Sequence, residues 1–146
     1  MSNTVRIHQR DEHVYDGVAT EEIDPGDLVA VVGVDGDDLQ FARHDSAGEK
    51  TAAYFAREYS HTGMSIEDSY QNGDHIEVLK LVPGDRAYGF LSDEEDVDAG
   101  DLLVSAGDGA LGEPAAGEEA HAVGIARESV NNSEAGDKTR IDVEVI

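Results

Sequence analysis

The chain has 146 residues, and its 33 acidic side chains outnumber the 10 lysines and arginines, which gives a formal net charge of −23. The absence of cysteine excludes disulfides, thiolate metal sites and cysteine nucleophiles. So few cations argue against direct binding to a nucleic-acid backbone, because that binding depends on lysine and arginine displacing counterions. No apolar run approaches the roughly 20 residues of a membrane span, and the polar first residues do not resemble a signal peptide.

The spread of the acids predicts a folded protein with an acidic surface rather than a disordered chain. Acidic residues are dispersed among regular apolar segments, and only three of the basic residues are lysine. Such a charge causes strong self-repulsion in dilute buffer, whereas in molar salt the Debye length falls to about 3 Å and the repulsion is screened. This composition is typical of halophilic archaea, so we expect a host that lives in high salt.

Residues 1–16 are predicted to form an N-terminal arm. The first ten residues carry Arg6 and Arg10 and no acid, in contrast to the rest of the chain. Val5 and Ile7 alternate with polar residues, a period typical of a strand that can add to an exposed sheet edge of a neighbouring subunit. The alternative is a frayed tail, as most termini are.

Short apolar runs separated by Gly-Asp turns predict β-strands along the rest of the chain. Seven of the sixteen glycines are followed by Asp, and this pair suits tight turns because Gly accepts positive φ and Asp bonds its own backbone. The runs are DLVAVVGV, HIEVLKLV, DRAYGFL, DLLVSA, HAVGIA and RIDVEVI, and EKTAAYFAREY is also interpreted as a strand. The predicted core is Leu28, Val29, Val31, Ile76, Val78, Leu102, Leu103, Val123, Ile125, Ile141 and Val143.

Two pairs of matching segments indicate an internal repeat. Gly26-Asp27-Leu28 corresponds to Gly100-Asp101-Leu102 at an offset of 74 residues, and Ala56-Arg57-Glu58 corresponds to Ala126-Arg127-Glu128 at an offset of 70. In each copy a closing strand follows the second segment. General reuse of Gly-Asp turns in β proteins is the alternative explanation, but it does not account for two nearly constant offsets.

The repeat predicts the fold class. Residues 17–146 are expected to form a single all-β domain, a small barrel or sandwich built from two similar three-strand units over about 21–82 and 94–146. A single unit exposes its apolar face and its strand edges, whereas two units can cover each other.

No motif in the sequence points to catalysis, and we predict that the chain is not an enzyme. The six histidines lack the His-Glu-x-x-His spacing of zinc sites, and phosphate-binding glycine motifs and Gly-x-Ser-x-Gly are also missing. The acidic stretches 34–38 and 94–101 do not fit the EF-hand pattern. We therefore expect no catalytic residue, no metal site and no cofactor.

Arg57 and Arg127 stand out because arginine is rare here and both occupy matching places in the repeat. Two interpretations are open. Each can pair with a local carboxylate such as Glu58 or Glu128, or each can form a bidentate bridge to another subunit.

Several segments, in order, resemble the small head-decoration or capsid-cement proteins of tailed viruses. These segments are IDPGDLVAV, FAREYSHTGMSIEDSYQNGDHIEVLKLVPGD, DVDAGDLLVSAGDGAL and AVGIARESV with TRIDVEVI, and together they span roughly residues 17 to 146. The resemblance implies a β-barrel protein on the outside of a capsid shell, bound to the major capsid protein, and no shared catalytic residues. It also implies a homo-oligomer, with a trimer favoured over a pentamer, and the acidic composition adds a haloarchaeal host.

With this resemblance, Val5, Arg6, Ile7, Arg10, Arg57 and Arg127 become the candidate contacts to neighbouring subunits or to the capsid. The alternative function is a ligand-binding β module for calcium or glycans.

Overall fold

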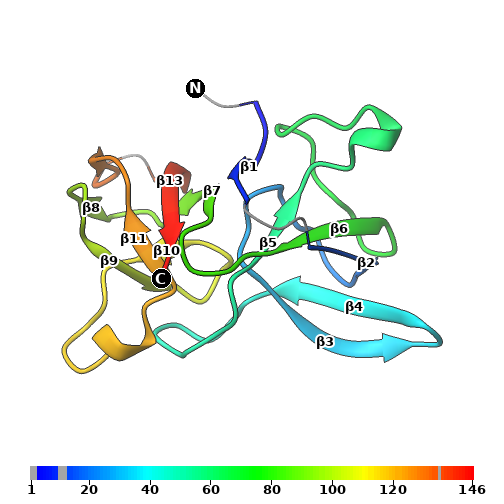
Figure 1. Cartoon of the computed structure of the whole chain (residues 1–146), viewed down its shortest axis with the longest axis horizontal. Coiled ribbons are helices and arrows are strands. Elements are labelled where there is room, and N and C mark those ends of the chain that lie inside the picture. The colour runs from blue at the N-terminus through cyan, green and yellow to red at the C-terminus, as the bar shows by residue number, and fades with distance from the viewer. Residues whose placement is uncertain (1–2, 10–12, 135) are drawn as a thin grey trace.

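The computed structural model describes residues 3–9, 13–134 and 136–146, and these residues form an almost entirely β structure. They contain thirteen strands and two short 3-10 helices, η1 (Ser60–Thr62) and η2 (Glu119–His121), with no α-helix in the described ranges. The prediction of an all-β fold with a barrel is confirmed. Figure 1 shows two groups of strands side by side, one from each half of the chain.

The first half of the chain forms a ring of five strands. They are β2 (Val14–Ala19), β3 (Val29–Asp35), β4 (Asp38–Arg43), β5 (Tyr54–Arg57) and β6 (His75–Lys80), hydrogen-bonded in the order β3-β4-β2-β6-β5. The β2–β4 pair is parallel and the other pairs are antiparallel. A bridge between Leu28 and Phe55 joins the start of β3 to β5, so the first and last strands of the order meet and the sheet closes.

The second half forms another closed ring with the same connections. Its strands are β7 (Arg86–Leu91), β9 (Leu102–Ser105), β10 (Leu111–Gly112), β11 (Gly124–Ala126) and β13 (Thr139–Val145), in the order β7-β10-β9-β11-β13, and β13 returns to β7. Here β7–β10 is the parallel pair. The two-residue strands β8 (Asp96–Val97) and β12 (Val130–Asn131) form a separate ribbon.

The repeat in the sequence therefore corresponds to a repeated barrel. The Gly26 N–H donates to the Ala56 carbonyl at 2.8 Å, and the Gly100 N–H donates to the Ala126 carbonyl at 2.7 Å, at the same point of each ring. The sequence analysis predicted three strands in each unit, and the structure shows five. Each copy closes on itself because β4 links β3 to β2 and β10 links β9 to β7.

Four turns with the sequence x-x-Gly-Asp share one geometry. The N–H of the Asp bonds the carbonyl of the first residue, the Gly has φ between 92° and 107°, and the Asp carboxylate accepts the N–H of the first residue. These turns are Asp24–Asp27, Gln71–Asp74, Val82–Asp85 and Asp98–Asp101. Gly is needed because an L side chain rarely adopts this φ, and the Asp closes the turn with its own side chain.

The two barrels share one hydrophobic cluster. On β5 and β6 the side chains alternate, so that Ala56 and Val78 fill the first barrel whereas Phe55 and Leu79 join the core of the second barrel. Gly89 on β7 makes room for this contact, because a Cβ there would lie 3.2 Å from Cε1 of Phe55. Because both faces of β5 and β6 are buried, these two strands hold one barrel against the other.

Most of the predicted core is buried, but the prediction for Val31 was wrong. Val31 is 42% exposed because it lies past the Leu28–Phe55 bridge that closes the ring, where β3 is the outer strand of its sheet. Figure 1 shows the β3–β4 hairpin pointing away from the second barrel. Leu102 and Ile125 are half-buried, and the other predicted core residues are buried.

The N-terminal segment contains a strand, β1 (Arg6–His8), where the alternation predicted one. It pairs antiparallel with β7 of the same chain, and Tyr88 N–H donates to the Val5 carbonyl at 2.7 Å. Val5 is fully buried in the second barrel's cluster. The boundary expected between residues 16 and 17 falls inside β2.

Candidate functional site

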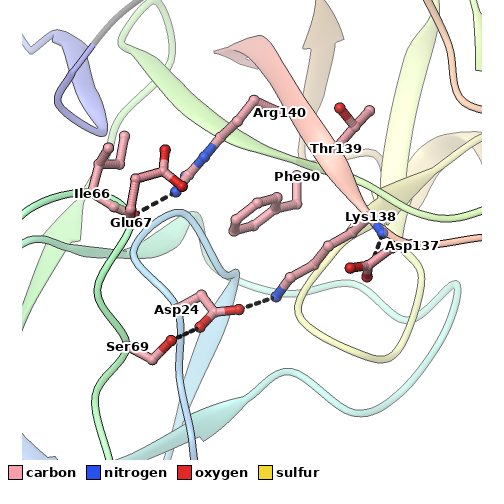
Figure 2. A pocket seen from close by; sticks show the side chains of 9 residues that line it. All are labelled: Asp24, Ile66, Glu67, Ser69, Phe90, Asp137, Lys138, Thr139 and Arg140. Carbon is pink, nitrogen blue, oxygen red and sulfur yellow. Dashed lines mark hydrogen bonds and ion pairs between the residues drawn. The ribbon is translucent and has the colours of Figure 1, made fainter. Parts of the chain in front are cut away.

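A contact of three charged side chains lies where the two barrels meet. Lys138, just before β13, extends its ammonium group to the first Gly-Asp turn, where it lies 2.8 Å from Asp24 Oδ2 (Figure 2). The same ammonium lies 2.9 Å from Asp27 Oδ1. Asp27 is completely buried, and its other oxygen accepts the Asp24 N–H at 2.8 Å. One of the chain's three lysines therefore holds the second barrel to the first.

The pKa values of these groups reflect burial and pairing. Burial raises the pKa of Asp27, although Lys138 and the Asp24 N–H oppose the shift. For Asp24, burial is outweighed by hydrogen bonds from Lys138 and Ser69, so its pKa is lowered. For Lys138, burial is outweighed by the two carboxylates, so its pKa is raised and the ammonium form is retained.

Arg140, on β13, makes a second connection beside Lys138. Its guanidinium donates to the Ile66 carbonyl at 2.8 Å, to the Tyr88 carbonyl at 3.3 Å and to the Pro25 carbonyl. The ring of Phe90 lies between the two cations, 4.1 Å from Arg140 Cζ and 4.3 Å from Lys138 Nζ, as Figure 2 shows. Burial lowers the pKa of Arg140.

Together these side chains border a hollow of about 340 Å³ between the barrels. Lys138 and Arg140 are directed at carboxylates and carbonyls of the first barrel, so their interactions are already satisfied within the chain. A buried His44–Ser105 hydrogen bond of 2.6 Å adds a further link between the halves. These contacts hold the two barrels in one orientation. We call the group of Lys138, Asp24 and Asp27 the ionic clasp.

Arg57 and Arg127 occupy equivalent places, and each pairs within its own chain. Arg57 lies 3.2 Å from Glu77 with side chains only 13% and 8% exposed, whereas Arg127 lies 3.0 Å from Glu144 with side chains 43% and 28% exposed. Both pairs join neighbouring strands, to Glu77 for Arg57 and to Glu144 for Arg127. The inter-subunit role stays a prediction.

The remaining predicted contact residues belong to the N-terminal segment. Val5 is buried inside the chain, whereas Arg6 and Ile7 on β1 are half-buried. Glu58, next to Arg57, accepts hydrogen bonds from Val5 N–H at 3.2 Å and from the Thr4 hydroxyl, which fixes the segment to the first barrel. Arg10 lies outside the described residues.

Sequence reasoning missed two features. It singled out arginines because they are rare, and the same signal applied to Lys138 and Arg140 in the stretch DKTRID. It also placed Val31 in the core, although Val31 is 42% exposed and its neighbours Val32 and Val34 are 57% and 63% exposed. This hairpin is the candidate surface for contact with another molecule, since exposed apolar patches often mark interaction sites.

Across residues 3–9, 13–134 and 136–146, no group of three or more His, Asp or Glu side chains is arranged to hold a metal ion. In the acidic stretch at 94–101, the Asp101 carboxylate accepts the Asp98 N–H at 2.9 Å and closes a turn. A search of the same residues finds no helix that is long and apolar enough to span a membrane.

By its architecture the chain is a tandem β-barrel protein, in which two five-stranded rings of equal topology are joined by a partly buried ionic clasp. Among solved structures it is similar to the N base of head fiber gp8.5 from bacteriophage phi29. The TM-score is 0.61 at 12% sequence identity, over 93% of this chain and 95% of that one. No protein-family model matches the sequence. No curated protein matches it either.

Proposed function

We propose that this chain is a structural protein of a virion, and that it binds the outer surface of a tailed-virus capsid shell by contacting the major capsid protein. The observation that carries the proposal is the fold shared with the phi29 head fiber base over nearly the full length of both chains. The similarity spans both barrels, so it concerns the whole arrangement and not one common β motif. The sequence resemblance to head-decoration proteins points to the same class.

The proposal includes two further properties. The first is a high-salt host, supported by the net charge of −23 and the presence of only three lysines. The second is a homo-oligomer, with a trimer favoured over a pentamer, because decoration proteins follow the symmetry of the shell. A structural role needs no catalytic site, and we propose none.

Co-sedimentation with capsids tests the function. Purified protein is mixed in molar salt with capsids of the virus that encodes it, after the native copies have been removed from the shell. We expect saturable binding at a fixed number of copies per shell, and none to capsids of an unrelated virus. Equal binding to both capsids, or none to either, would contradict the proposal. A rise in melting temperature with millimolar calcium at fixed ionic strength would instead favour a ligand-binding module.

A further inference from the structure

The β3–β4 hairpin carries an apolar face that its own chain does not cover. Val31 pairs across the hairpin with Phe41, and Val34 pairs with Leu39. Cross-strand partners lie on one face of a sheet, and Phe41 is completely buried in the first barrel. The face that begins as barrel core therefore continues along β3 past the Leu28–Phe55 bridge, and there Val31 and Val34 are exposed.

The hairpin separates apolar from charged residues along its length. Residues 28–34 contain no charged side chain in a chain of net charge −23. The tip then places Asp35, Asp37 and Asp38 next to one another, all exposed. A surface that receives this hairpin should be apolar along the strand and basic where the tip arrives.

A groove with that chemistry exists elsewhere on the same protein. It has a volume of about 250 Å³ and lies where the linker between the barrels meets the end of β13, with Ala52, Pro83 and Ile146 among its lining residues. Lys50 and Lys80 also line it, so two of the chain's three lysines are found here. Lys50 is exposed, and Lys80 is half-buried with its ammonium 5.8 Å from the Tyr15 ring centroid.

The exposed large apolar side chains of the described residues divide between these two places. Val31, Val32 and Val34 are on the hairpin, while Ile146 lines the groove and Val82 lies beside it in the linker. Figure 1 shows the hairpin pointing outward from the first barrel, away from the C-terminal end of β13 on the second barrel. Within one chain the hairpin therefore points away from this groove.

We propose that the β3–β4 hairpin of one copy binds the groove at Lys50 and Lys80 of a second copy. The contact is head to tail, since two different surfaces meet, and repeated contacts of this type close into a ring when the rotation allows it. In molar salt, long-range attraction is screened, so burial of the valines supplies affinity while the Asp and Lys side chains set the register. The inference rests on the homo-oligomer part of the proposed function and not on capsid binding.

Cysteine cross-linking tests the contact directly, because the chain has no cysteine of its own. The variant with Val34→Cys and Ala52→Cys is oxidised in molar salt and separated on a non-reducing gel. We expect covalent multimers in which the hairpin cysteine of one copy is joined to the groove cysteine of another, as identified by peptide mass. In a matched variant, Val34→Cys is combined with Ala99→Cys, and Ala99 is exposed on the second barrel. This variant should form no covalent multimers. Bonds formed mainly between two hairpin cysteines, or equally in both variants, would overturn the proposal.

Mass measurements give an independent test. Val32→Thr with Val34→Thr keeps β-branched side chains, so the hairpin is retained, but we expect the dissociation constant of the oligomer to rise on the order of tenfold for each valine lost. Lys50→Glu with Lys80→Glu should also weaken assembly. When the two double variants are mixed, the intact groove of the valine variant can bind the intact hairpin of the lysine variant. The mixture should therefore form a one-to-one dimer that cannot extend.

The results separate this inference from the capsid hypothesis. Far-ultraviolet circular dichroism of each variant checks that the barrels are folded. A wild-type protein that is monomeric in molar salt, or a valine variant with unchanged mass, would refute the contact. If instead the cross-links form and wild-type protein fails to bind capsids, the capsid hypothesis fails and the contact stands.

Discussion

The ionic clasp between the barrels can be tested by replacing Lys138 with Met, which keeps the length of the side chain and removes its charge. The substitution leaves the fully buried Asp27 carboxylate without its cation, and Asp24 loses the same partner. Breaking a buried ion pair from one side costs about 3 to 5 kcal/mol. Because Asp24 and Lys138 are 26% and 18% exposed, we expect the lower end, about 3 kcal/mol of unfolding free energy.

For a chain of this length, that loss lowers the melting temperature by about 6 to 12 °C. The assay is thermal unfolding in molar salt, followed by circular dichroism. Arg127→Met is the matched control, because the Arg127–Glu144 pair is solvent-exposed and such pairs contribute at most about 1 kcal/mol. Adding Asp27→Asn to Lys138→Met should restore part of the loss, since the unpaired charge is removed. If Lys138→Met costs no more than Arg127→Met, the clasp does not stabilise the junction.

Low salt, high pH and deletion of the N-terminal segment should each lower the stability of the fold or of its assembly. In a salt series, folding or assembly should be lost below about 0.1 M, where the Debye length exceeds about 10 Å; an unchanged spectrum and mass in dilute buffer would contradict the high-salt interpretation. Burial raises the pKa of Tyr70, so above about pH 10 the unfolded chain releases a proton that the native state keeps. The free energy of unfolding, measured by denaturant titration, should therefore fall by up to about 1.4 kcal/mol per pH unit. The Tyr70→Phe variant should show a smaller fall. Deleting residues 2–9 removes the buried Val5 and should lower the melting temperature, whereas an unchanged melting curve would show that the arm is only a tail.

The sequence predicted the strands whose apolar pattern is regular. Each predicted run contains a strand of the structure, and the Gly-Asp anchors mark equivalent points of the two rings, as the bonds of Gly26 and Gly100 show. The pattern missed β4, because DDLQFAR has little alternation, and β10, because two residues make no pattern. Ring closure depends on these strands, so the sequence alone did not show that each copy closes by itself.

The candidate surfaces were predictable only in part. The rarity of arginine led to Arg57 and Arg127, and both are paired across strands in their own barrel. The Lys138 clasp depends on a contact with Asp27, 111 residues earlier in the chain, and no local pattern reveals a contact at that separation. The exposure of Val31 was missed for a related reason, because an apolar strand that leaves the barrel has the same composition as one that stays inside it.

The two copies of the barrel differ in strand length at the place where the contact between molecules is proposed. Strands β3 and β4 have seven and six residues, whereas their equivalents β9 and β10 have four and two. The segment between the two sequence anchors is also four residues longer in the first copy, since the offset falls from 74 to 70. A shared topology is explained by the need to close a small ring, which both copies meet equally well. Strand β4 closes the first ring through its pairing with β2, but closure does not require the three exposed valines of β3, and the proposed contact with another molecule would bury them.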